Sequence, residues 1–301
     1  MKLQVVPART GVTWVKEGIR TFWRQPLALS GLFFIFLGLI SICSLLPYFG
    51  AFAGLIVLPA MSLGLMAASR EALLGKFPMP SILFTGFRQG PLQSRRILLL
   101  GFGYALLFSF ILTLSSLFDG GEFARMYLLG GEINEGIVND SHFQEAVLFS
   151  FVMYLPLSAL FWHAPALVHW HMQPVAKSLF FSIMACVGNW RAFVVFGLAW
   201  VLIFITTSLL LSLISMLTDE GQLSPILLLP AMLMLSAMFF TSCYFSFKDC
   251  FNSEPVLAET WVNLATDKAN HFTPWRANLT CALASSPKPS TDSTAPSPNL
   301  A

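Results

Sequence analysis

Charged side chains are scarce in this chain of 301 residues: Asp, Glu, Lys and Arg make up 11% of it, against 56% hydrophobic residues. A soluble domain carries roughly 25% charged residues, so a surface bathed mostly in water is excluded. The formal net charge of +2 does not suggest a nucleic-acid partner, and no basic patch is interleaved with aromatic residues. The composition predicts a membrane protein whose partners are lipids, with another membrane protein or a second copy as further candidates.

Cysteine pairs and reaction motifs are also missing. The chain has no CxxC pair and no zinc-ligand spacing, so neither a disulfide framework nor a metal site is predicted. It lacks a P-loop, a Gly-rich dinucleotide turn, a GxSxG elbow and an HExxH pair. We therefore predict no catalytic, metal-binding or cofactor-binding residue and interpret the chain as non-enzymatic. The five cysteines, expected to be small apolar residues in or beside helices, are Cys43, Cys186, Cys243, Cys250 and Cys281.

Long intervals without charge are the main feature that is present. A charge at the centre of a membrane helix costs about 2.5–3.5 kcal/mol on insertion scales, and a span needs roughly 20 apolar residues. The first interval is too long for a signal peptide and continues into a second span. The sequence predicts an all-α polytopic bundle followed by a tail, 252–301, disordered from Ser285. The six predicted spans are 27–46, 52–68, 97–118, 147–170, 192–217 and 224–247.

Lysine and arginine favour the same side at every crossing. The opposite side contains the loop 119–145, which has six acidic residues against the lone Arg125. Because basic loops stay in the cytoplasm, both termini are predicted to be cytoplasmic and the acidic loop extracytoplasmic. The basic residues that carry this prediction are Lys2, Arg9, Lys16, Arg20, Arg24, Arg70, Lys76, Arg88, Arg95, Arg96, Lys177, Arg191 and Lys248.

Three segments that precede the odd-numbered spans, 12–25, 79–92 and 175–189, have the pattern of amphipathic helices. In the first, Lys16, Arg20 and Arg24 follow one another at intervals of four, as in a helix lying among anionic headgroups. Each segment could instead pack against the bundle, because amphipathicity alone does not separate these two interpretations. In the third, the expected apolar face is Val175, Leu179, Ile183 and Val187, with Ser178 and Ser182 opposite.

These segments also suggest a threefold internal repeat. Phe22, Pro26 and Gly38 recur 65 residues later as Phe87, Pro91 and Gly103. Each copy would be a surface helix plus a helical hairpin, and the copies would run parallel rather than inverted. Small residues are expected to let helix backbones approach closely. They are Gly50-xxx-Gly54 and Ala60-xxx-Gly64-xxx-Ala68, while the even spans share the triplets Pro59-Ala60-Met61, Pro165-Ala166-Leu167 and Pro230-Ala231-Met232.

Polar groups inside or beside the spans are few. His163 lies well inside one, which makes it a functional candidate by default. Steps of six and two residues to His169 and His171 put the three rings on different helix faces, so a shared metal is not expected. Asn189, Lys248 and Asp249 are the polar groups at one interface that a lipid-headgroup enzyme would need.

Two hydroxyl stripes could hold helices together or line a polar path through the membrane. Such hydroxyls usually bond to a neighbouring helix or to their own backbone carbonyls. The stripes are Ser109, Thr113 and Ser116 in the third predicted span, and Ser208, Ser212 and Ser215 in the fifth.

Several short stretches between residues 5 and 251 form a recognisable pattern. They are Pro7-Ala8-Arg9-x-Gly11-x-x-Trp14, Gly18-x-Arg20-x-Phe22, Pro47-x-x-Gly50, Pro59 with Gly64-x-Met66, Phe84-x-Gly86-Phe87-Arg88, Ala164-Pro165, Asn189-Trp190 and Ser242-Cys243-Tyr244-x-Ser246-x-Lys248-Asp249-x-Phe251. These stretches resemble a proteobacterial family of uncharacterised six-span inner-membrane proteins, and the arrangement is more distantly similar to the membrane domain fused to some glycerophosphodiester phosphodiesterases. The resemblance implies six spans and an inner-membrane location, with no catalytic residue to carry over.

The hypothesis that follows is a scaffold or accessory subunit of the bacterial inner membrane. A transporter or channel for small solutes or lipids is the alternative, with a path along the hydroxyl stripes and His163.

Overall fold

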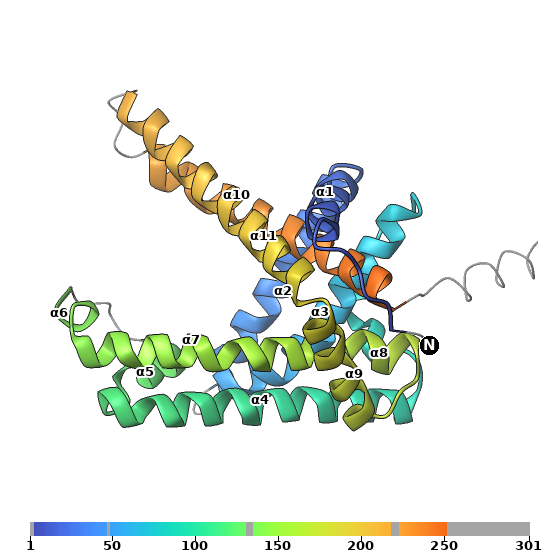
Figure 1. Ribbon diagram of the computed structural model, residues 1–301, viewed down its shortest axis with the longest axis horizontal. Coiled ribbons are helices and arrows are strands. Elements are labelled where there is room, and N and C mark those ends of the chain that lie inside the picture. The colour runs from blue at the N-terminus through green and yellow to red at the C-terminus, as the bar shows by residue number, and fades with distance from the viewer. Residues whose placement is uncertain (1–2, 47–48, 131–134, 218–222, 252–301) are drawn as a thin grey trace, which may run out of the picture. The chain divides into compact units, whose positions relative to one another are not determined.

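The computed structural model describes residues 3–46, 49–130, 135–217 and 223–251, so the predicted tail and part of the acidic loop lie outside the described residues. Where described, the chain is helical, and its only β feature is an isolated bridge between Leu3 and Phe251. Six helices are long and apolar enough to cross a membrane, which confirms the predicted all-α class (Figure 1). They are α2 (Pro26–Ser44), α3 (Gly50–Leu73), α4 (Pro91–Asp119), α7 (Ser141–Phe161) continued by α8 (Ala164–Trp170), α10 (Trp190–Leu217) and α11 (Leu223–Cys250).

The helices extend past the charge-free intervals at their basic ends. Helix α4 begins at Pro91, which occupies the first turn where its missing N–H is tolerated, and so includes Arg95 and Arg96. Helix α3 likewise continues past Arg70 to Leu73. Charge marks where the hydrocarbon ends, whereas the backbone stays helical into the headgroup layer because long basic side chains reach outward from it.

The fourth span breaks between α7 and α8, at Trp162 and His163. Pro165 follows the break, and a proline has no N–H to continue the helical hydrogen bonds. A serine of α9 (Val175–Gly188) repairs the gap: the backbone N–H of His163 donates to Ser182 Oγ (3.0 Å), and Ser182 Oγ donates to the carbonyl of Ala159 (2.8 Å). The hydroxyl thus replaces the direct helical bond from residue 163 to residue 159.

The acidic connection between α4 and α7 contains three short helical turns. It begins after Gly120, whose φ of +67° suits glycine and ends α4. Asp140 caps the start of α7 by accepting a hydrogen bond from the backbone of His142 (3.2 Å). The turns are α5 (Glu122–Arg125), η2 (Met126–Gly130) and α6 (Glu135–Val138).

The first predicted surface helix packs against the bundle. Helix α1 (Thr10–Phe22) contacts α10 and α11, and its Trp14 and Phe22 are fully buried. Of the predicted apolar face, Val12 at the start of the helix and the neighbouring Trp23 are exposed. The apolar face of this helix is therefore covered by protein, which decides between the two interpretations left open by its periodicity.

The other two surface segments differ from expectation. Residues 79–92 do not form one helix: the 3-10 helix η1 (Pro80–Phe87) packs on α3, and Pro91 already starts α4. In α9 the serine face is the one buried most deeply: Ser178 and Ser182 are buried, the predicted apolar residues Val175, Leu179 and Ile183 are half-buried, and Val187 is exposed. Small hydroxyl side chains allow close packing and supply hydrogen bonds to α7, while the larger apolar side chains can face lipid at no cost.

The surface segments share one packing rule. η1 packs on α3, α9 packs on α7 and α8, and α1 packs on α11. In terms of the predicted repeat, η1 and α9 each contact the even-numbered span of the copy before their own. Helix α1 belongs to the first copy and contacts α11, the even-numbered span of the last copy. The proline triplets are less uniform, because Pro59 and Pro165 are buried whereas Pro230 is exposed.

Close backbone approach depends on glycine at several of these contacts. A Cβ added to Gly18 of α1 would lie 2.4 Å from Ser242 Cβ, and one on Gly64 would lie 2.5 Å from Leu83 Cα. Within the predicted small-residue motif, Gly64 thus allows η1 to approach α3 closely. A Cβ added to Gly54 would have no neighbouring atom closer than 3.5 Å, so this glycine is not required for a close approach.

Gly101 should be far less tolerant of substitution than its neighbour Gly103 on the same helix. A Cβ on Gly101 would lie 2.0 Å from the carbonyl oxygen of Ile56 in α3, whereas one on Gly103 would meet nothing within 4 Å. Overpacking of this kind costs roughly 1–3 kcal/mol. We expect Gly101→Ala to lower the free energy of unfolding in detergent by about 2 kcal/mol, and Gly103→Ala to leave it unchanged or raise it. Equal effects of both substitutions would contradict the α3–α4 contact.

Candidate functional site at the basic ends of the spans

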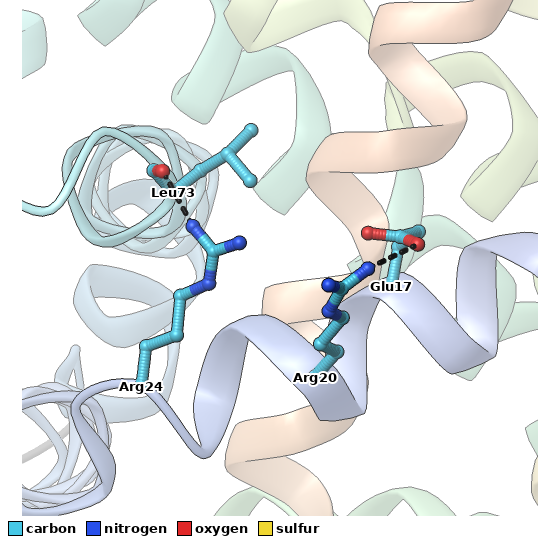
Figure 2. A network of polar contacts seen from close by, with 4 residues as sticks. All are labelled: Glu17, Arg20, Arg24 and Leu73. Atoms are coloured by element: carbon cyan, nitrogen blue, oxygen red, sulfur yellow. Dashed lines mark hydrogen bonds and ion pairs between the residues drawn. The ribbon is translucent and has the colours of Figure 1, made fainter.

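Hydrogen bonds join the basic ends of different spans to one another. Arg24, just before α2, donates from Nη1 to the carbonyl of Leu73 at the end of α3 (2.8 Å), as Figure 2 shows. Arg96 of α4 donates to the carbonyl of Met172, just after α8 (3.1 Å). Gln4 donates its backbone N–H to the carbonyl of Cys250 at the end of α11 (2.9 Å). The starts of the odd spans and the ends of the even spans therefore lie on the same side.

Asn189 is the centre of this region. It is 2% exposed, and its Oδ1 accepts the backbone N–H of Val6 (2.7 Å). Its Nδ2 donates to the carbonyls of Gln4 and Ala185, both at 3.0 Å, and contacts Cys250 Sγ at 3.6 Å. One amide thereby connects the N-terminal segment, the end of α9 and the end of α11.

The other two polar residues predicted for this interface, Lys248 and Asp249, lie near Asn189. Asp249 accepts a hydrogen bond from the Trp14 indole (2.8 Å), and Lys248 is half-buried beside it on α11. Two of the three predicted residues thus have structural partners in α1 or the N-terminal segment. The structure brings the three to one end of the bundle, as an interfacial site would require, but uses Asn189 and Asp249 to bind the chain to itself.

His163 is enclosed by aromatic rings. Its own ring is fully buried, and the ring centroids of Phe193, Phe247 and Phe251 lie 5.4–5.9 Å from it. Neither imidazole nitrogen has a hydrogen-bond partner among the described residues. The ring contributes packing at the α7–α8 break, and among the described residues no carboxylate or second histidine hydrogen-bonds to it as a relay would need.

The other two histidines lie toward the end of α8. His169 is 4% exposed, and burial lowers the pKa of His171 below its ordinary value, so His171 is uncharged at neutral pH. Within the described part of the chain, the structure brings together no group of three or more His, Cys, Asp or Glu residues suited to a metal ion.

The hydroxyl stripes bond mainly within their own helices. Thr113 donates to the carbonyl of Ser109 (2.9 Å) and Ser116 to that of Thr113 (2.6 Å). Ser208 donates to the carbonyl of Phe204 (3.0 Å). Thr113 and Ser212 are exposed and so face away from the bundle interior. These contacts follow the ordinary behaviour of hydroxyls in membrane helices.

Several hydrogen bonds that join the helices were not predicted from the sequence, although Ser242 and Ser246 lie in one of the stretches that carry the family resemblance. Trp162 and Trp200 donate their indole N–H groups to Ser246 and Ser242 of α11, at 3.1 and 3.2 Å. Gln93 of α4 is buried and donates to the carbonyl of Val168 in α8. A polar residue next to a tryptophan-rich apolar segment only weakly predicts such a hydrogen bond, because the sequence does not indicate which helices will be in contact.

One cleft opens on this side of the molecule, where α3 ends and η1 begins. Its volume is about 620 Å³, and basic, acidic, hydroxyl and apolar side chains line it.

These features define a polytopic helical membrane protein with its basic helix ends joined on one side. The chain belongs to the family of the probable inner membrane protein BTH_II0599 of Burkholderia thailandensis: the two are 35% identical over 254 residues, which cover 83% of this chain and 94% of that protein. No family model matches the chain, and no solved structure matches it.

The comparison confirms the predicted membership of a family of bacterial inner-membrane proteins, and the protein is a multi-pass protein of that membrane. The more distant resemblance to the membrane domain of glycerophosphodiester phosphodiesterases receives no support from it.

Asn189 should be essential for the stability of this region. Removing its amide would leave the part-buried N–H of Val6 and carbonyl of Gln4 without this partner, and an unsatisfied buried group costs roughly 1–3 kcal/mol. We expect Asn189→Ala to lower the free energy of unfolding in detergent by about 2 kcal/mol or more. Ser208→Ala, which removes a bond within one helix, should change it by less than about 0.5 kcal/mol. A harmless Asn189→Ala would show that the N-terminal segment is not held in this way.

Proposed function

We propose that the protein is a non-enzymatic scaffold or accessory subunit of the inner membrane, with both termini in the cytoplasm. The observation that carries this proposal is the hydrogen-bond network of Asn189. A catalytic group must be free to meet a substrate and must be oriented by a neighbouring base or acid. Here the buried amide at the interface is used to hold the N-terminal segment, α9 and α11 together.

The lipid-facing surface supports a role in assembly. Helix α10 contacts α1 and α11, while the rest of its surface exposes long apolar side chains. Another membrane helix or a second copy of the chain could pack there in place of lipid. The exposed residues include Leu198, Leu202, Ile205, Leu209 and Leu213.

The transporter alternative has less support. Its expected path ran along the hydroxyl stripes and His163, but Thr113 and Ser212 are exposed and His163 is packed among phenylalanines.

Flux measurements test the proposal directly. Proteoliposomes that contain the purified protein should release entrapped ions and small polar dyes within about twofold of the rate of protein-free vesicles. The matched variant is Ser109→Ala/Ser208→Ala, which removes a hydroxyl from each stripe and should not alter that rate. Selective flux through the wild-type protein that this double substitution reduces would overturn the scaffold in favour of transport.

Orientation is a separate prediction. Basic segments remain in the cytoplasm, and the hydrogen bonds of Arg24, Arg96 and Gln4 place the basic ends on one side. A fluorescent protein fused after Phe251 should therefore fluoresce, and alkaline phosphatase inserted between α4 and α7 should be active. Exchanging the two reporters should abolish both signals. Phosphatase activity at the C-terminal position would reverse the proposed orientation.

A further inference from the structure

The cleft between α3 and η1 combines features that suit a ligand. Glu71 contributes from the last turn of α3, the connection to η1 contributes Lys76, and His169 of α8 lines it as well. Its volume of about 620 Å³ falls within the roughly 300–1,000 Å³ typical of small-molecule sites.

Two cations reach the cleft from opposite ends of η1. Lys76 precedes this helix and Arg88 follows it, and both side chains are exposed. The described residues form no ion pair with either of them, in contrast to Arg20 on α1, which lies 3.8 Å from Glu17 (Figure 2). Among the described residues that line the cleft, Glu71 is the only carboxylate, so these residues have an excess of one positive charge. That balance favours an anion that also has hydroxyl or ammonium groups.

His169 provides a second, independent observation. Its side chain is 4% exposed and lines the cleft, and its Nδ1 has no hydrogen-bond partner among the described residues. Buried polar atoms are nearly always satisfied in folded proteins. The nitrogen is covered by protein, so a polar group that enters the cleft can hydrogen-bond to it only if the ring shifts.

The apolar part of the lining indicates what kind of molecule carries that group. Phe77 and Met79 also line the cleft, and they are 65% and 66% exposed. Both follow α3, which ends at Leu73 and is long and apolar enough to cross a membrane, so we expect them near the level where headgroups meet acyl chains. Cations beside exposed apolar side chains at that depth are typical of surfaces that bind anionic lipids.

We propose that this cleft binds a phosphate-bearing amphiphile, a phospholipid of the surrounding membrane. Lys76 and Arg88 bind the phosphate, Glu71 and His169 hydrogen-bond to the polar groups of the headgroup, and Phe77 and Met79 contact the start of the acyl chains. This site is independent of the proposed function, because a scaffold and a transporter could each hold such a lipid.

Titration of the full-length protein in an uncharged detergent with dihexanoyl phosphatidylglycerol, followed by calorimetry, tests the site. Lys76→Gln/Arg88→Gln removes the two cleft cations. Lys16→Gln/Arg95→Gln removes the same charges from exposed positions on α1 and α4 outside the cleft. All four side chains are exposed, so both variants should fold, and their melting temperatures confirm this. We expect the cleft variant to bind the lipid at least tenfold more weakly, and the control variant to bind within twofold of the wild type.

Two further ligands separate the sources of the phosphate. Inorganic phosphate has the anion without the chains, and dihexanoylglycerol has the chains without the anion; both should bind at least tenfold more weakly than the phospholipid. Inorganic phosphate that binds as tightly as the lipid would overturn the amphiphile in favour of a soluble phosphate compound. Equal losses in the two double variants, or tight binding of dihexanoylglycerol, would overturn the site itself.

Discussion

The need to satisfy every backbone polar group in a solvent without water controls this structure. In hydrocarbon an unpaired N–H or carbonyl costs several kcal/mol, so a break in a spanning helix persists only where another group completes its hydrogen bonds. The fourth span meets this requirement at His163, where the Ser182 hydroxyl accepts from one side of the break and donates to the other. Helix α9 is therefore a necessary part of that span.

The same requirement explains why polar side chains cluster at one end of the bundle. Three spans begin and three end there, and the N-terminal segment also needs partners for its backbone groups. Asn189 serves Val6 and Gln4, and Arg24 serves the carbonyl of Leu73 (Figure 2). Asn189 and Asp249, which the sequence offered as part of a possible reactive cluster, hydrogen-bond to other segments of the chain instead. Lys76 and Arg88 differ from them because they face a cleft and have no such role among the described contacts.

Much of the fold could be predicted, and the errors have identifiable causes. For the interfacial helix at 175–189 the sequence left open whether its apolar face meets lipid or the bundle. In the structure Ser178 and Ser182 are buried and Val187 is exposed, because lipid can cover large apolar side chains while small residues favour close packing. The motif around Gly64 was expected to let helix backbones approach closely, and Gly64 meets η1; a small residue permits an approach without specifying the partner. For Gln93 the sequence offered no distinguishing signal, and Ser246 was noted only within a matching stretch, because the roles of both exist only once α4, α8 and α11 are adjacent.

The sequence by itself determined the six apolar helices, the sides of their basic ends relative to one another, and the class of the protein. These properties follow from local composition, because each apolar interval is hydrophobic enough to enter hydrocarbon independently of the others. Only the tertiary structure decided which segments contact which: α1 on α11, Ser182 at the break in the fourth span, and the cleft that brings Lys76, Arg88 and His169 together. Such contacts join residues far apart in the chain, and hydrophobicity, which any apolar neighbour satisfies equally well, does not specify them.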